Sequence, residues 1–316
     1  MPNYTRDYLT ERHDDYESKF QDWNFHLLSY LGGQDYQNGY LLNRYVLESD
    51  EEYIKRMNNT AIDNHCKNVV QIYSSFLFRV PPTRNYGSLS GDEQLENFIK
   101  DADLDGRSFD NIIREMQINA SIYGTCWAIM DKPAVQTETR AEEIQLDIRP
   151  YISVYTPENV LNWKYQRMIN GRYELTELTL LENLQNDVAT LRVWTKEDIT
   201  TLMVIEFNNG YSKSQPILID EMPNMINEIP AVVLYNQKSQ KRAIGISDLQ
   251  DVAELQKSIY NDYSEIEQLI RLSNHPSLVK TPNVEASAGA GSIIEIPEDM
   301  QSDLKPYIIQ PSSQSL

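Results

Sequence analysis

The sequence predicts an α+β fold in which helices come first, a mainly antiparallel sheet follows, and one long helix comes after the sheet. Three observations predict this order. Apolar residues recur at helical spacing before residue 124. Residues 125–234 then form short alternating or β-branched runs separated by polar turns. Helical spacing returns over residues 244–275.

Residues 1–48 are aromatic and polar and show no steady period. Gly32-Gly33 and Asn38-Gly39 mark turns within this segment. We therefore expect an N-terminal arm over residues 1–48 that is extended or partly helical.

Three helices are predicted between the arm and the sheet. Ser49–Glu52 carries the Ser-x-x-Glu capping pattern, and the apolar stripe after it predicts one long helix that reaches Pro81. Ser90–Glu93 caps a shorter helix. Ser108 opens a third helix, which we expect to end at Gly124.

The sheet is predicted to be largely antiparallel, because connections such as Asn170-Gly171 are short and polar. Such connections argue against a doubly wound nucleotide-binding fold. Seven strands are expected, over Thr125–Met130, Leu146–Tyr155, Arg172–Leu181, Thr190–Thr195, Leu202–Phe207, Pro216–Ile219 and Ala231–Leu234.

The long helix is predicted over residues 244–275. Ser247 and Gln250 form a capping-box pattern at its start, and Asn274-His275-Pro276 supplies a stop. Between these ends, apolar residues form one continuous stripe that predicts a single packing face, made of Leu249, Val252, Leu255, Ile259, Tyr263, Ile266 and Ile270.

The remaining surface of this helix is acidic. Asp248, Asp251, Glu254, Asp262, Glu265 and Glu267 stand against only Lys257 and Arg271. Taken alone, an acidic face of an amphipathic helix is most often a solvated outer surface.

Composition excludes several classes of function. The chain has 316 residues, with 28 Lys and Arg against 47 Asp and Glu, and its formal net charge of -19 opposes nonspecific attraction to phosphate or anionic lipid. No apolar run reaches the roughly 20 residues that span a bilayer, and the start has no signal-peptide pattern, so we expect a soluble, intracellular protein. Two cysteines cannot build a disulfide framework or a four-cysteine metal site.

The motifs that carry chemistry are missing. The sequence contains no phosphate-binding Gly-rich loop followed by Lys, no dinucleotide fingerprint and no nucleophile elbow. His65 and Cys66 are neighbours on a predicted helix, where side chains point about 100° apart and do not easily share one ion. The basic cluster Lys238–Arg242 is interpreted as a solvated turn. We therefore predict no catalysis, no metal site and no cofactor.

Three stretches, taken in order and spacing, resemble the portal proteins of tailed bacteriophages, which form the head-tail connector ring at the unique capsid vertex. The first is Tyr53–Pro82, which ends in Phe76-Leu-Phe-Arg-Val-Pro-Pro82. The second runs from Gly106 to Pro133 as a helix that feeds a strand. The third is Ile244-Gly-Ile-Ser-Asp-Leu249, the long helix, and Asn274–Val279.

The resemblance implies a domain plan. Residues 49–243 would form the portal wing, residues 244–275 the first stem helix, and residues 276–316 the start of the clip. Members of this family continue with a returning stem helix, a tunnel loop and a crown, so we expect the chain to be truncated before the second stem helix and the crown.

The resemblance also implies a function. The protein would be a non-enzymatic subunit of a homo-oligomeric ring, typically a dodecamer, through which double-stranded DNA passes without sequence-specific binding. The implied partners are the terminase large subunit, the major capsid protein and neck or adaptor proteins, with no membrane involved. The protein would reside in the virion, and in the host cytoplasm during assembly. Another virion assembly or scaffold protein without a DNA channel is the alternative, and an enzyme ranks third.

Two groups of site residues on the long helix follow from this resemblance. The candidate channel-facing residues are Asp251, Glu254, Asp262 and Glu265. The candidate interface residues are Leu249, Val252, Leu255, Ile259, Ile266 and Ile270.

Overall fold

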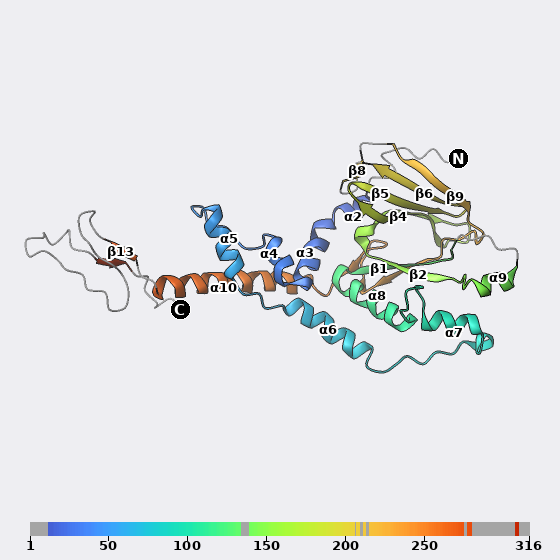
Figure 1. Ribbon diagram of the computed structural model, residues 1–316, viewed down its shortest axis with the longest axis horizontal. Helices are drawn as coiled ribbons and strands as arrows, with labels where there is room; N and C mark the ends of the chain where they lie inside the picture. The colour runs from blue at the N-terminus through green and yellow to red at the C-terminus, as the bar shows by residue number, and fades with distance from the viewer. Residues whose placement is uncertain are drawn as a thin grey trace, which may run out of the picture. The chain divides into compact units, whose positions relative to one another are not determined.

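The computed structural model describes residues 12–133, 139–205, 207–208, 211–212, 215–274, 277–279 and 307–309. It contains helices together with antiparallel sheets, so the α+β class is confirmed (Figure 1). The chain divides into two compact units. Unit 1 comprises Met1–Leu31 and His65–Ala253, and unit 2 comprises Gly32–Asn64 and Glu254–Leu316.

The main sheet of unit 1 has five strands in the order β3-β4-β5-β6-β9, and all neighbours are antiparallel. Apolar side chains alternate between its two faces, as a period of two requires. On one face, Leu178 and Trp194 belong to the larger core, while on the other Leu191 and Leu202 form a second cluster. The strands are β3 (Val160–Arg167), β4 (Tyr173–Gln185), β5 (Val188–Thr195), β6 (Asp198–Ile205) and β9 (Ile217–Pro223).

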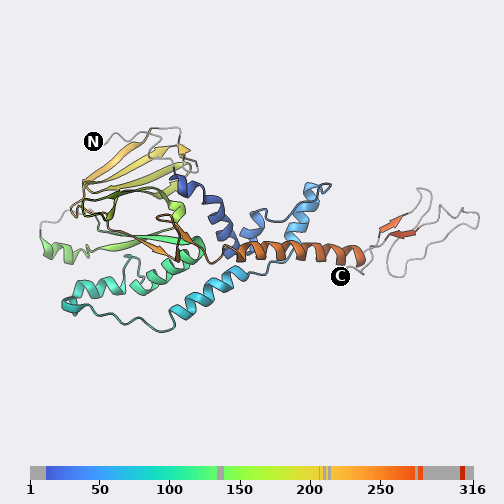
Figure 2. The same cartoon turned by 180° about the vertical axis from the view of Figure 1, so that it is seen from behind.

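A three-stranded antiparallel sheet in unit 1 has the order β10-β1-β2, with β1 (Thr125–Asp131) in the centre, β2 (Tyr151–Tyr155) and β10 (Ala231–Tyr235). Helix α8 (Phe109–Tyr123) leads into β1 and lies beside it (Figure 2). Gly124 ends α8 with φ of 88°, and a Cβ there would lie 2.5 Å from the carbonyl oxygen of Gly245. The predicted start at Ser108 and end at Gly124 agree with the structure.

Tyr16 is one of the residues that join the N-terminal segment of unit 1 to its core. Tyr16 is fully buried, and its hydroxyl donates to the carbonyl oxygen of Ala243 at 2.8 Å and accepts from the indole Nε1 of Trp127 at 2.8 Å. Its ring lies 4.0 Å from that of Trp163. The other elements of unit 1 are α2 (Asp14–Glu17), α3 (Phe20–Leu31), α6 (His65–Leu77), η1 (Gly87–Leu89), α7 (Glu93–Lys100), α9 (Arg140–Gln145), η2 (Pro157–Asn159), β7 (Phe207–Asn208), β8 (Tyr211–Ser212), β11 (Gln237–Lys238) and β12 (Gly245–Ile246).

Unit 2 contains α4 (Gly33–Asn38), α5 (Asp50–Asn59) and the long helix α10 (Val252–Asn274) from Glu254 onward. Strand β13 (Ser277–Val279) pairs antiparallel with β14 (Tyr307–Ile309), with Leu278 opposite Ile308. These short strands are what the structure describes of residues 276–316. The rest of the expected clip lies outside the described residues.

Several predicted boundaries differ from the structure. The helix expected from Ser49 to Pro81 is two helices, α5 and α6, in different units, because Thr60 is extended with ψ of 124°. The capping box at Ser49 itself is present. Asp92, not Ser90, caps α7. The expected strand over 146–155 is shortened to β2, because α9 extends to Gln145 and Leu146 caps it. Strand β3 was not predicted.

The long helix begins at Val252, later than the predicted residue 244. The Ser247 hydroxyl does not cap it. It accepts from the amide of Leu249 at 2.9 Å and lies 2.8 and 2.6 Å from the carbonyl oxygens of Ser121 and Ile122. Residues 247–251 are therefore a turn attached to the end of α8. The expected domain plan, with boundaries at residues 48, 243 and 275, stays a prediction.

Candidate functional site

The candidate site is α10, because it carries most residues of both groups that the sequence singled out. In unit 2 this helix buries a row made of Gln256, Tyr260 and Ser264. At 3.6 residues per turn these positions span an arc of about 80° on the helix surface. Two of the three side chains are polar. The face that the chain buries for itself is therefore not the predicted apolar stripe.

Residues from α4, α5 and the segment between them cover this buried row. The ring of Tyr36 meets that of Tyr260 edge-on at 5.3 Å. The Tyr260 hydroxyl lies 3.5 Å from the carbonyl oxygen of Met57. The Oδ1 atom of Asn261 accepts from the amide of Asn43 at 2.7 Å. Hydrogen bonds thus fix the register of α10 against the segment between α4 and α5.

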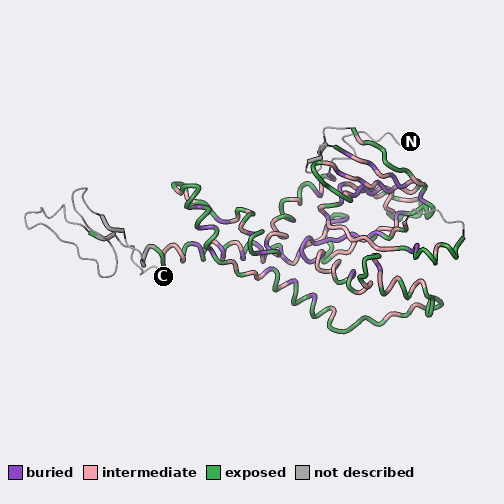
Figure 3. The backbone as a smooth tube through the Cα atoms, in the orientation of Figure 1, coloured by how far each residue is buried: buried purple, intermediate pink, exposed green. Residues whose placement is uncertain are grey.

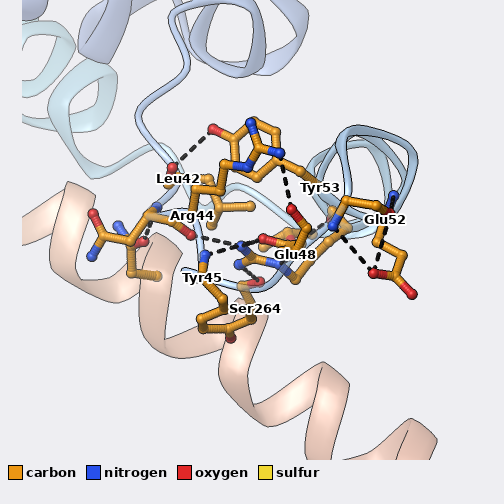
Figure 4. A network of polar contacts seen from close by, with 12 residues as sticks. Leu42, Arg44, Tyr45, Glu48, Glu52, Tyr53 and Ser264 are labelled. Carbon is orange, nitrogen blue, oxygen red and sulfur yellow. Dashed lines mark hydrogen bonds and ion pairs between the residues drawn. The ribbon is translucent and has the colours of Figure 1, made fainter.

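A buried ion pair lies at the centre of these contacts (Figure 4). The Arg56 guanidinium donates to both carboxylate oxygens of Glu48, from Nε and Nη2, each at 2.7 Å, and both side chains are only 4% exposed. Its Nη1 donates to Ser264 Oγ at 2.9 Å and its Nη2 to the carbonyl oxygen of Asn43 at 2.6 Å. The hydrogen bond from Arg56 holds the pKa of the Glu48 carboxyl below its ordinary value.

Tyr45 makes a second polar contact with α10. Its hydroxyl donates to Glu265 Oε1 at 2.6 Å, and the Arg56 guanidinium stacks 4.2 Å from the centre of its ring. Burial, together with the hydrogen bond to the Glu265 carboxylate, raises the pKa of Tyr45 to about 12. Figure 4 shows Tyr45, Glu48 and Ser264 converging. Glu265 is exposed, yet its carboxylate already accepts a hydrogen bond from Tyr45 of the same chain.

Between Tyr45 and Glu48 the chain makes a tight turn that sequence reasoning missed. The amide of Glu48 donates to the carbonyl oxygen of Tyr45 at 3.2 Å. The two residues of the turn, Val46 and Leu47, are 100% and 96% exposed. We call this pair the Val46–Leu47 tip. Its sequence signal is an adjacent apolar pair in the otherwise polar or aromatic run from Asn43 to Asp50.

The predicted apolar stripe is divided. Leu249 precedes the helix and is buried in the core of unit 1. Val252 is partly buried and packs against this core. In unit 2, Leu255 is 63% exposed, Ile259 is half-buried, and Ile266 and Ile270 are exposed. Figure 3 shows this mixture of buried and exposed residues along α10. We call Leu255, Ile259, Tyr263, Ile266 and Ile270 the apolar stripe from here on.

The predicted channel-facing residues are all exposed, but they do not all lie on the helix. Asp251 lies in the turn before α10. Glu254, Asp262 and Glu265 share one face of about 80°, centred about 105° from the centre of the apolar stripe and about 155° from that of the buried row. Helix α10 therefore has three separate faces: a buried polar row, an uncovered apolar stripe and an acidic face.

A family model described as phage portal protein, SPP1 Gp6-like, matches residues 5–307. This chain belongs to that family of phage portal proteins. The resemblance predicted from the sequence is thereby confirmed. No curated protein sequence matches the chain. Membership of the family identifies a structural protein of the phage virion and supports assembly into a ring.

The basic cluster and the two cysteines of this portal protein were the other groups considered for chemistry. The basic cluster Lys238–Arg242 is largely exposed, as expected of a solvated turn. Two of its side chains have partners: Lys241 pairs with Asp15, and the Arg242 guanidinium stacks 3.8 Å from the centre of the Tyr173 ring. Asp15, Lys241 and Arg242 line a surface cavity of about 610 Å³ together with His13 and Trp163. Burial raises the pKa of the thiols of Cys66 and Cys126 to about 12 each.

Across the described segments, no group of three or more His, Cys, Asp or Glu side chains is placed to hold a metal ion. In the same part of the chain, no helix is both long and apolar enough to cross a membrane.

Proposed function

We propose that this portal protein is a subunit of the ring at the unique capsid vertex, and that α10 is the stem helix whose acidic face lines the DNA channel. The separation of α10 into three faces carries the proposal. A helix in the wall of a narrow ring meets the channel on one side, its neighbours at about 90° on either flank, and its own subunit behind. An acidic face, an apolar stripe and a buried row match these surroundings.

The charge of the acidic face suits passage of DNA rather than binding. Each lysine facing the duplex would form a contact with phosphate, whereas carboxylates repel phosphate over about a Debye length, roughly 8 Å at physiological salt. Glu254 and Asp262 are exposed and project from this face. The net charge of -19 acts in the same direction.

The apolar stripe is proposed as the contact with the neighbouring subunit, or with a returning helix. Exposed apolar surface of this kind is typical of assembly sites, and a cyclic ring repeats the contact at every subunit. We further propose a dodecamer, the wing role for residues 49–243, the clip role for residues 276–316, and docking of the terminase large subunit, the major capsid protein and neck proteins.

The channel is tested in the complete gene product with Glu254→Lys and Asp262→Lys combined. Rings should still form, and DNA packaging should fall by at least tenfold, because the channel wall would then bind phosphate. The matched control is Glu221→Lys with Glu228→Lys, which makes the same charge change at exposed positions of unit 1. Wild-type packaging by the α10 variant would exclude a channel role for this face.

The alternative, a virion assembly or scaffold protein without a DNA channel, is distinguished by images of the purified particles. A ring with a central opening supports the portal function. A closed or filamentous assembly would favour the alternative.

A further inference from the structure

We propose that in the assembled ring the Val46–Leu47 tip of each subunit packs on the apolar stripe of the next subunit. This inference rests on the proposed function, because it names what covers the stripe of a ring subunit. The occupant is a second copy of this chain.

The Val46–Leu47 tip is held in a fixed conformation by the residues on either side of it. Val46 and Leu47 are fully exposed, so an apolar partner that covers them removes apolar surface from water. Both ends of the turn are also held in place. Tyr45 is fixed by its hydrogen bond to Glu265, and Glu48 by its paired contact with Arg56. The tip is therefore held against α10 before any partner arrives, which lowers the entropic cost of docking.

The contacts that anchor the tip and the apolar stripe lie on opposite sides of α10. The segment that carries the tip is bonded to α10 directly at Asn261 and Glu265, through Asn43 and Tyr45. It is also held at Ser264 through Arg56 of α5, which pairs with Glu48. These positions are centred about 165° around the helix from the centre of the apolar stripe. A subunit cannot place its own tip on its own stripe, so the two surfaces require two copies.

Opposite placement of two unlike surfaces is what a cyclic ring needs. In a head-to-tail interface, one surface of each subunit meets a different surface of the next, and the contact closes into a ring. When the acidic face points to the axis, the stripe lies about 105° to one side and the tip segment about 60° to the other. Both directions point towards neighbouring subunits.

The level along the helix also matches. The tip is anchored at Glu265 through Tyr45, and at Ser264 through the pair of Glu48 and Arg56. A closed ring has no rise from one subunit to the next, so the tip meets its neighbour at the same height. At that height the stripe presents Tyr263 and Ile266, both exposed.

Cysteine cross-linking of the complete gene product tests the contact. Leu47→Cys combined with Ile266→Cys should give, on mild oxidation of rings, a ladder of covalent multimers on a nonreducing gel. The native Cys66 and Cys126 are buried and stay in place. The matched control combines Leu47→Cys with Asp262→Cys, on the acidic face of the same helix, and should give no ladder. Rings that form without the Leu47–Ile266 ladder overturn the inference.

A second variant covers the case in which the cysteine pair fails to assemble. Val46→Ser with Leu47→Ser changes only exposed side chains, so the monomer should stay folded while the concentration needed for ring formation rises at least tenfold. Met225→Ser with Ile226→Ser alters another exposed adjacent apolar pair, in unit 1, and should assemble normally. Normal assembly of the tip variant overturns the inference, whereas absence of rings from the wild-type protein overturns the proposed function first.

Discussion

At the scale of single residues, Arg56 joins separate segments of unit 2. Its guanidinium bonds Glu48, Ser264 and the backbone of Asn43. Removing one partner of a buried pair leaves the other charge without compensation, which typically costs about 3–5 kcal/mol. We expect Arg56→Met to destabilise unit 2 by this amount, measured by denaturant unfolding and by hydrogen exchange in α5.

The control for Arg56→Met is a pair on the surface. Lys100 lies 4.0 Å from Glu96, and both side chains are mostly exposed. Exposed pairs contribute about 1 kcal/mol or less, so Lys100→Met should barely change the free energy of unfolding. Equal effects of the two substitutions would mean that the Arg56 pair is not buried in solution.

Glu48 makes this stability depend on pH. Because its folded pKa lies below the ordinary value of 4.5, its contribution is fully present above about pH 4.5 and is lost as the pH falls through the folded pKa. The difference in unfolding free energy between wild type and Glu48→Gln should therefore narrow as the pH is lowered from neutral towards about 3. A difference that stays constant over this range would contradict the assignment.

Gly124 is a residue that only glycine fits. Its φ is 88°, and a Cβ added at this position would lie only 2.5 Å from the carbonyl oxygen of Gly245. Gly171 has φ of 79° but no atom nearer than 3.9 Å to that point. Gly171→Ala should thus cost about 1 kcal/mol of backbone strain, and Gly124→Ala clearly more, because the strand connection must also move. Thermal unfolding of the two variants measures the difference.

At the scale of elements, one face of α10 is expected to stabilise the subunit and another face to form the contact between subunits. Tyr260→Ala removes a buried ring and should destabilise the subunit by about 3–5 kcal/mol. Leu255→Ala with Ile259→Ala alters a largely uncovered surface and should cost the monomer only about 1 kcal/mol, while weakening the ring. Sedimentation and unfolding measured on the same samples distinguish the two effects. If the Leu255 and Ile259 variant unfolds as readily as Tyr260→Ala, the stripe packs within its own subunit.

Sequence reasoning succeeded where the signal was local. The cap at Ser49, the limits of α8 at Ser108 and Gly124, and the antiparallel sheet depend on neighbouring residues. The predictions were wrong where residues distant in the sequence determine the local structure. Ser247 has the pattern of a cap, but the carbonyl groups at the end of α8 hold its hydroxyl.

The candidate site was predictable only in part. The stripe and the acidic face of α10 follow from their spacing, and both are exposed on the structure. The buried row could not be foreseen, because it contains polar residues, which leave no apolar periodicity in the sequence. One of its contacts joins Ser264 to Arg56, and these two residues are 208 positions apart in the chain. The Val46–Leu47 tip was missed because two residues in a turn have no periodicity. The sequence of strand β3 does alternate at Leu161, Trp163 and Tyr165, and that signal was available, although a register shift between Val160 and Asn162 puts Leu161 in the second cluster.

At the scale of the whole molecule, the proposal requires one closed assembly. The complete gene product should form a single dodecameric species by native mass measurement, with a central opening in particle images. Rings should bind double-stranded DNA weakly, because the proposed channel face carries carboxylates. Rings with Glu254→Lys and Asp262→Lys should retain DNA, and this retention should fall steeply with salt. Tight, salt-insensitive binding by wild-type rings would contradict a conducting channel.

The way the turn at residues 45–48 is fastened to α10 gives such a ring a mechanical property. Hydrogen bonds from Asn43, Tyr45 and Arg56 oblige this turn to move with the helix of its own subunit. With its apolar pair seated on the adjacent helix, a tilt of one helix pushes or pulls the next. The wall of the channel would then widen or narrow as a linked circle rather than helix by helix, so a disturbance by passing DNA at one subunit would spread around the circumference.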